Sequence, residues 1–322
     1  MARFFSMGEA LIDFIPTDID TDLKNVSGFS KKPGGAPANV AAAVAKLENE
    51  AFFIGKLGSD AFGDYLLETM NGVGINTAHV SRTDEANTCL AFVSLKSDGN
   101  REFSFYRKPS ADLLLSPEEI DSDWFQSGDI MQFCTVSLPP ASPVRDAHRR
   151  VIDIVKGKNG VIYFDPNLRF PLWPDRDALK ETCLEFMEYA DVVKISDEEL
   201  EFITGTPDEK KAADFLFSKG VKLFIYTEGK DGAKLFTPKV RAAAAGFKVD
   251  AIDTTGAGDA FLGGFIGKMM NDGKIIEDID DAYAAELLEW SNACGAIVSS
   301  RQGAISSMPD ENEIKAFINK LL

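Results

Sequence analysis

One short segment combines glycines and carboxylates in a pattern that could bind a phosphate and activate a hydroxyl: Asp253-Thr254-Thr255-Gly256-Ala257-Gly258-Asp259. An apolar stretch before it, Phe247–Ile252, is predicted to be a strand, and a helix is predicted to follow. Glycines allow backbone to approach a ligand closely, and N–H groups at a helix start attract anions. Asp259 would lie beside that anion site, where its carboxylate could accept a proton from the attacking hydroxyl.

The same residues also have a purely structural interpretation. Aspartate often caps the start of a helix, so Asp259 could have that role alone. Gly256 and Gly258 could equally serve a tight turn. Taken by itself, the segment leaves the two interpretations open.

Other nucleotide-binding motifs can be tested directly. Each Gly-Lys pair of the chain is followed by Leu, Asn, Asp, Met or Ile and never by Ser or Thr, which excludes a Walker-type P-loop. The turn at Gly256 ends in Phe261 where a dinucleotide fingerprint requires a third glycine. The chain also contains no Asp-Phe-Gly and no His-Arg-Asp, so protein kinases are disfavoured along with Rossmann dehydrogenases.

Three further loops have residues suited to a polar ligand. Gly34-Gly35-Ala36-Pro37-Ala38-Asn39 opens an alanine-rich helix, and Asn39 offers both a donor and an acceptor to a polyol. Gly55–Gly63 and Asp165–Arg169 each follow a predicted strand. Open α/β sheets bind ligands just beyond the carboxyl ends of their strands, so these loops are candidates for the same site. Each loop taken alone could also be an ordinary turn.

The elements that must position these loops alternate along the chain. Strand-length apolar runs at Val161–Phe164, Val192–Ile195 and Leu223–Thr227 are separated by segments with helical periodicity. This alternation predicts an α/β fold with a mainly parallel central sheet flanked by helices. Further helices are predicted at Ala38–Leu47, Leu179–Tyr189 and Ala260–Met270. No low-complexity linker divides the chain, so residues 1–322 are predicted to form one domain.

One region breaks the alternation. Thr88–Leu95 and Arg101–Arg107 are joined by Lys96-Ser97-Asp98-Gly99-Asn100, and Asp-Gly between two such runs indicates a hairpin. The two-residue period places Phe103, Phe105 and Arg107 on one face, where they could meet a ligand. An edge hairpin with Arg107 at the solvent rim is the alternative. With residues 13–33, residues 88–107 are predicted to form a small β-strand lid.

Composition narrows the partners. Hydrophobic residues make up 45% of the chain, and 34 basic against 51 acidic residues give a net charge of −17. Such a charge repels phosphate backbones and anionic lipid, so neither nucleic acid nor a membrane is expected as a partner. Four dispersed cysteines, two histidines and the absence of a signal-peptide pattern favour a reduced, cytoplasmic protein without a His-rich zinc site.

Taken together, these segments resemble the two signatures of the ribokinase-like (PfkB) carbohydrate kinases, from about Phe5 to Pro309. Within that family the chain is most similar to fructokinases. The similarity to fructokinases lies in Gly8–Phe14, Arg107–Asp112, Asp165–Trp173 and Lys194–Leu200. The resemblance implies a ribokinase-like, Rossmann-like α/β fold and an ATP-dependent sugar kinase.

The resemblance also implies roles for individual residues. Asp259 would be the general base, and Gly256, Ala257 and Gly258 would form the anion hole for the transferring phosphoryl group. The residues implied to bind the sugar are Asp13, Gly34, Gly35, Asn39, Phe105, Arg107, Arg169 and Asp259. The residues implied to frame ATP are Ser196, Thr227, Glu228, Gly229, Gly232, Gly258 and Asn292.

Metal ions are implied by the same resemblance. Glu199 would assist Mg²⁺ near the phosphates, although many relatives have Asn-x-x-Glu where this chain has Ser196-Asp197-Glu198-Glu199. A potassium ion would lie near residues from two segments: Asp253, Thr255, Val298, Arg301, Gly303 and Ser307.

The expected reaction is transfer of the ATP γ-phosphoryl group to D-fructose, giving ADP and fructose 6-phosphate. A 2-keto-3-deoxygluconate kinase is the alternative within the fold, because Arg107 and Arg169 could pair with a sugar-acid carboxylate. A nucleotide-dependent oxidoreductase and a non-catalytic sugar-binding module are alternatives from other classes. Edge pairing of the lid would allow a homodimer.

Overall fold

The computed structural model describes residues 2–18, 20–95 and 101–321. Within them, the main sheet has nine strands in the order β13-β12-β11-β10-β9-β8-β1-β4-β5. Seven of these strands run parallel to one another: β1, β4, β5, β8, β9, β10 and β11. The strands β12 and β13 add an antiparallel edge. Their bounds are β1 Phe4–Met7, β4 Ala51–Gly58, β5 Asn76–Thr83, β8 Ile130–Cys134, β9 Val161–Asp165, β10 Val192–Ser196, β11 Leu223–Thr227, β12 Gly232–Phe236 and β13 Arg241–Ala245.

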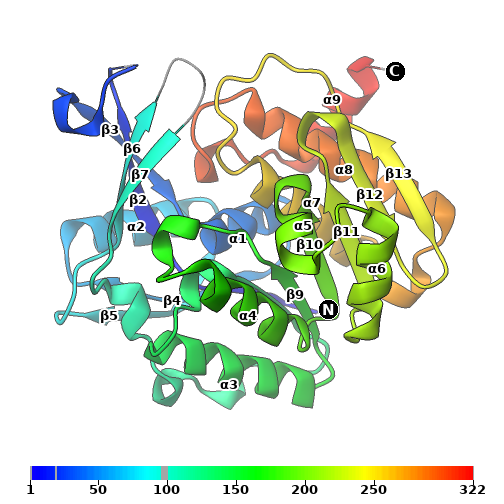
Figure 1. Cartoon of the computed structure of the whole chain (residues 1–322), viewed down its shortest axis with the longest axis horizontal. Coiled ribbons are helices and arrows are strands. Elements are labelled where there is room, and N and C mark those ends of the chain that lie inside the picture. The colour runs from blue at the N-terminus through cyan, green and yellow to red at the C-terminus, as the bar shows by residue number, and fades with distance from the viewer. Residues whose placement is uncertain (1, 19, 96–100, 322) are drawn as a thin grey trace.

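Helices cover both faces of this sheet (Figure 1), because its central strands are apolar on both sides. One face packs on α1 (Ala36–Lys46), α2 (Ala61–Gly72), α7 (Ala257–Asn271), α8 (Asp281–Ser299) and α9 (Glu311–Leu321). The other face packs on α3 (Pro143–Gly157), α4 (Arg176–Met187), α5 (Asp197–Thr204) and α6 (Glu209–Ser218). The predicted α/β fold with a mainly parallel sheet is confirmed.

Small residues allow α7 to lie deep in the core. A Cβ atom placed on Gly264 would come within 2.5 Å of the Cys294 Sγ atom on α8, and one on Gly267 would come within 2.6 Å of Leu47. The helix is therefore clamped between its neighbours, which fixes the direction in which its first turn points.

A second, four-stranded sheet stands beside the main body (Figure 1). Its order is β3-β2-β6-β7, with bounds β2 Leu11–Pro16, β3 Phe29–Gly34, β6 Leu90–Leu95 and β7 Arg101–Tyr106. The antiparallel pairing of β6 with β7 confirms the predicted hairpin strands, and the sheet is the predicted small lid. The turn predicted at 96–100 lies outside the described residues.

Two predictions about individual segments are wrong. Phe247–Ile252 is not a strand: Ile252 is 63% exposed, and its N–H donates to the Ser299 carbonyl at the end of α8, 2.8 Å away. The sheet edge beside this segment is already formed by β12 and β13, so the chain leaves the sheet instead. The loop expected from Gly55 onward begins later, because β4 continues to Gly58.

No helix in the described part of the chain is long and apolar enough to cross a membrane.

Candidate active site

A cavity of about 1100 Å³ lies between the lid sheet, the carboxyl ends of β9, β10 and β11, and the first turn of α7. This is the edge of a parallel sheet at which α/β proteins bind ligands. Most of the predicted site residues line it: Asp13, Gly35, Asn39, Phe105, Arg169, Ser196, Glu199, Thr227, Gly229, Gly232, Thr255, Gly256, Ala257, Gly258, Asp259 and Asn292. The fold thus brings together loops that are widely separated in the sequence.

The first turn of α7 is built around Gly256. This residue is the helix N-cap in the left-handed region, with φ of 79°, and a Cβ atom there would lie 2.6 Å from the Ala304 Cβ atom. A side chain is therefore excluded by both conformation and space. The first N–H groups of an α-helix have no partner within the helix, so this turn presents donors and the positive end of the helix dipole to the cavity.

Asp259 lies on that first turn and is buried. The Asn39 Nδ2 atom donates a hydrogen bond of 2.8 Å to its Oδ2 atom. Burial raises the pKa of Asp259, while the bond from Asn39 and the positive charges of Lys194 and Arg169 act in the opposite direction. A carboxylate with a raised pKa at the floor of a cavity is suited to accept a proton.

A buried ion pair next to Asp259 was missed from the sequence. The Lys194 Nζ atom on β10 lies 2.6 Å from the Asp165 Oδ2 atom on β9, and both residues line the cavity. Burial raises the pKa of Asp165 to about 6, although Lys194 opposes the shift. The sequence held a signal for each: Asp165 ends the apolar run of β9, and Lys194 is a charged residue inside the apolar run Val192–Ile195.

The lid contributes the opposite wall of the cavity. Asp13 on β2 and Phe105 on β7 line it, together with Gly35, whose φ is 107°. Gly34 does not line the cavity but lies directly beneath Asp13, where a Cβ atom would collide with the Asp13 carboxylate. Glycine at this position leaves room for the acidic side chain to face the cavity.

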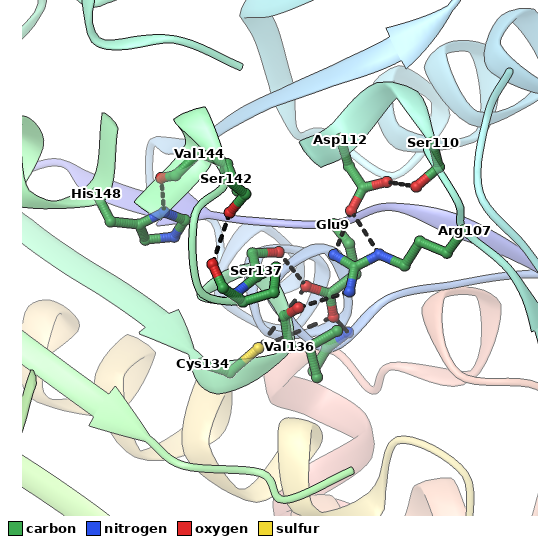
Figure 2. Close-up of polar contacts among 12 residues, drawn as sticks. Glu9, Arg107, Ser110, Asp112, Cys134, Val136, Ser137, Ser142, Val144 and His148 are labelled. Carbon is green, nitrogen blue, oxygen red and sulfur yellow. Dashed lines mark hydrogen bonds and ion pairs between the residues drawn. The ribbon is translucent and has the colours of Figure 1, made fainter. Parts of the chain in front are cut away.

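Arg107 does not lie where the sequence predicts it (Figure 2). Its Nε atom donates to the Asp112 Oδ2 atom at 2.9 Å, and its Nη1 atom donates to the Val136 carbonyl at 2.6 Å. The residue is only 7% exposed and is not among those that line the cavity. Asp112 follows five residues later and captures the guanidinium beneath the lid, which contradicts both a sugar contact and a position at the solvent rim.

Glu9 was also missed from the sequence, and it lies in the same buried cluster (Figure 2). Its carboxylate accepts hydrogen bonds from the Ser137 hydroxyl at 2.7 Å and from the Ala36 N–H at 3.3 Å. Burial raises the pKa of Glu9, although the nearby Arg107 lowers it. Glu9 lines the cavity, and its carboxylate holds the start of α1, which carries Asn39.

The far end of the cavity is framed by β10, β11 and α8. Glu199 caps the start of α5, where its oxygens accept from the Leu168 N–H at 2.7 Å and the Ser196 N–H at 3.0 Å. Asn292 on α8 donates to the carbonyls of Ala244 and Ala245. Glu228 does not line the cavity, and it pairs with Lys234 at 3.1 Å instead.

The residues predicted for potassium lie on neighbouring segments, although of these only Thr255 lines the cavity. The Asp253 carboxylate accepts from the N–H groups of Thr255 at 3.0 Å and Gly303 at 3.2 Å. The Ser307 carbonyl accepts from Arg301 at 3.3 Å, and the Val298 carbonyl accepts from the Arg301 N–H at 3.0 Å. Among the described residues, no group of three or more His, Cys, Asp or Glu side chains could hold a metal ion.

Known proteins are similar to this chain both in sequence and in architecture. Residues 1–311 match the family described as pfkB family carbohydrate kinase. The probable fructokinase-4 of Arabidopsis thaliana is 41% identical over 314 residues, which cover 97% of this chain and 95% of that protein.

Solved structures of carbohydrate kinases have the same fold as this chain. Fructokinase from Vibrio cholerae O395, in a form that binds fructose, ADP and calcium ion, superposes with a TM-score of 0.88 at 34% identity, covering 98% of this chain and 99% of that one. A double mutant of that enzyme holds fructose, ADP and potassium ion. An E. coli chain assigned as ribokinase II, in complex with ATP and Mg²⁺, has a TM-score of 0.89 at 26% identity, covering 99% of this chain and 100% of that one. The chain belongs to the pfkB family of carbohydrate kinases and is a fructokinase-like sugar kinase.

Proposed function

We propose that the protein transfers the γ-phosphoryl group of ATP to the 6-hydroxyl of D-fructose. The observation that carries this proposal is the position of Asp259. This buried carboxylate lies on the helical turn of α7 that directs N–H donors into the cavity, and Asn39 on α1 donates a hydrogen bond to it. The relatives named as fructokinases support fructose as the acceptor.

The reaction follows from the arrangement of these groups. Asp259 takes the proton of the 6-hydroxyl as its oxygen bonds to the γ-phosphorus, and the bond from that phosphorus to the bridging oxygen of ADP breaks. The N–H groups of the turn at Gly256, Ala257 and Gly258 stabilise the charge on the phosphoryl oxygens. Asp13, Gly35, Asn39, Phe105 and Arg169 orient the sugar, so that the attacking oxygen stays in line.

The nucleotide is assigned to the far end of the cavity, where Ser196, Thr227, Gly229, Gly232 and Asn292 lie. A magnesium ion would arrive with ATP and neutralise charge on its phosphates. Glu199 fits a supporting role, because it lines the cavity and its carboxylate is held in place by two backbone N–H groups. Potassium is assigned to the oxygen-rich segments around Asp253 and Ser307. A homodimer formed through the lid stays a prediction.

The proposed acceptor is tested by measuring ADP release from Mg-ATP with fructose, ribose, 2-keto-3-deoxygluconate, glucose and adenosine. Turnover selective for fructose is expected. Preference for 2-keto-3-deoxygluconate would move the substrate within the same fold. The sugar-acid alternative is less favoured because Arg107 is engaged with Asp112, leaving Arg169 as the cavity-lining member of the predicted arginine pair. If no sugar of the panel causes ADP release, the result would favour a non-catalytic sugar-binding module.

The pH dependence of turnover is expected to report the ionisation of Asp259. The base must be ionised to accept a proton, so kcat/KM falls as the pH falls through its pKa, which burial places above the ordinary value. Replacing Asn39 with alanine removes a hydrogen bond that lowers this pKa. The acidic limb of the pH profile should therefore move to higher pH in N39A. An unshifted limb would contradict the role of Asn39 in keeping Asp259 ionised.

Replacing Glu9 is expected to weaken the binding of the sugar and to leave the binding of ATP unchanged. Replacing it with alanine removes its hydrogen bond to the Ala36 N–H and frees the start of α1. A hydrogen bond of this kind contributes ~1.5 kcal/mol, and a loss of that size in sugar binding raises the KM for fructose about tenfold. Steady-state kinetics should show a smaller rise in E9Q, which keeps an acceptor, and no change in the KM for ATP. Equal effects on both substrates would contradict this role.

A further inference from the structure

We propose that Lys194 contacts the transferring phosphoryl group and is a further catalytic residue, an inference that rests on the proposed kinase reaction. Its Nζ atom lies 3.6 Å from the position that a Cβ atom on Gly258 would occupy, and its Cε atom lies 3.9 Å from the same point. Gly258 belongs to the first turn of α7, so the ammonium group lies close to the turn whose N–H groups are assigned to the phosphate. Lys194 also lines the cavity.

The surrounding charges keep this lysine protonated. Although burial alone lowers the pKa of Lys194, the carboxylates of Asp165, Glu199 and Asp259 outweigh that effect and raise it. These acidic groups come from β9, α5 and α7, which surround the end of β10. A fixed positive charge within a strongly acidic protein is suited to an anionic ligand such as a phosphate.

The ammonium group has donors to spare. It carries three N–H bonds, and in the part of the chain that the structure describes its hydrogen-bond partner is the Asp165 Oδ2 atom, 2.6 Å away. The register of β9 and β10 pairs Phe164 with Val193, so Asp165 and Lys194 are the next residues along two neighbouring strands. Asp165 is therefore a positioning residue that holds the lysine at the carboxyl edge of the sheet, beside α7.

A second lysine–aspartate pair in the same sheet shows the contrast. Lys222 lies 2.9 Å from Asp191, but these residues precede β11 and β10, at the edge of the sheet opposite the cavity. The Lys222 side chain is 54% exposed. This pair has no access to the proposed phosphate position and provides a matched control.

The role of Lys194 in the reaction is electrostatic. As the new bond from the 6-oxygen to phosphorus forms and the bond to the ADP oxygen breaks, Lys194 stays protonated and donates hydrogen bonds to the phosphoryl oxygens. The proton of the hydroxyl goes to Asp259, so Lys194 gains and loses none. Its contribution should be greatest when the phosphoryl group lies between the two oxygens.

The test compares K194M, the double variant D165N/K194M and the control K222M. The double variant is needed because removing one partner of a buried ion pair can unfold a protein, whereas removing both leaves neither member of that pair behind as a lone charge. Circular dichroism melting establishes that each variant is folded. Turnover with Mg-ATP and fructose is then measured together with calorimetric affinities for ADP and for ADP with aluminium fluoride and fructose, which imitates the phosphoryl group in transfer.

The double variant is expected to lose about 10²- to 10³-fold in kcat, as when one donor to a transition-state charge is removed. Its affinity for ADP with aluminium fluoride should fall by a similar factor, while its affinity for ADP alone stays within about twofold of wild type. K222M should match wild type. Unchanged affinity for the aluminium fluoride complex would overturn the proposal. So would recovery of kcat at high pH, which would show that Lys194 acts only through the pKa of Asp259.

Failure of the proposed function would look different. A wild-type protein that releases no ADP with any sugar would overturn the kinase reaction and, with it, the role of Lys194. Wild-type activity on fructose that persists in the folded double variant would overturn the role of Lys194 alone.

Discussion

Replacing Asp259 with asparagine is expected to lower kcat by about 10²- to 10⁴-fold, the range that general base catalysis provides. Asparagine keeps the size of the side chain but cannot accept the hydroxyl proton. The KM for fructose and the melting temperature should change little, because the partly desolvated carboxylate is replaced by a neutral group of the same shape. The measurement is steady-state ADP release from Mg-ATP and fructose, with thermal melting of the same samples.

The matched control is Asp177→Asn, which changes an exposed aspartate in the first turn of α4. That variant should keep wild-type turnover, since Asp177 does not line the cavity. Near-normal turnover in D259N would remove Asp259 from the role of base. A large fall in melting temperature with intact kcat would leave Asp259 only its structural interpretation as a helix-start residue.

Replacing Gly256 with alanine is expected to damage both activity and stability. The residue has a φ of 79°, and a Cβ atom would lie 2.6 Å from that of Ala304. The left-handed conformation costs an L-residue ~1–2 kcal/mol, so urea titration should show a loss of at least that size in the free energy of unfolding. Because the turn must shift to admit the methyl group, its N–H donors should lose the phosphoryl group, lowering kcat by about 10²- to 10³-fold.

Gly157→Ala is the control for this variant. Gly157 ends α3, and a Cβ atom there meets no heavy atom within 4 Å. Alanine in a helix is favoured over glycine by ~0.5–1 kcal/mol, so G157A should be as stable as wild type or slightly more stable, with unchanged kcat. Equal behaviour of G256A and G157A would contradict the importance of the anion-binding turn.

Local patterns account for the parts of the fold that were predicted correctly. Apolar runs such as Val192–Ile195 are strands because they are buried on both faces, and the Asp253–Asp259 segment is a turn into a helix because its glycines permit it. The prediction of a strand at Phe247–Ile252 failed for a non-local reason. Apolar periodicity does not reveal that β12 and β13 already form the edge of the sheet at that point.

The sequence predicts which loops form the site, but it does not predict the contacts between their side chains. The sequence motifs identify Asp259 and Asn39, but their 2.8 Å contact depends on how α1 and α7 pack. The Lys194–Asp165 pair depends on the register of two strands, which no spacing in the sequence shows. Arg107 was misplaced because strand alternation gives the face on which a side chain begins, not the partner that its long chain reaches.

The most direct test of the central proposal is ³¹P NMR of the wild-type protein with Mg-ATP and D-fructose. The proposed reaction predicts that the ATP signals are replaced by those of ADP and of fructose 6-phosphate in equal amounts, and that D259N leaves the ATP signals unchanged over the same time. A phosphate attached to another hydroxyl, or the release of inorganic phosphate alone, would contradict the proposed reaction.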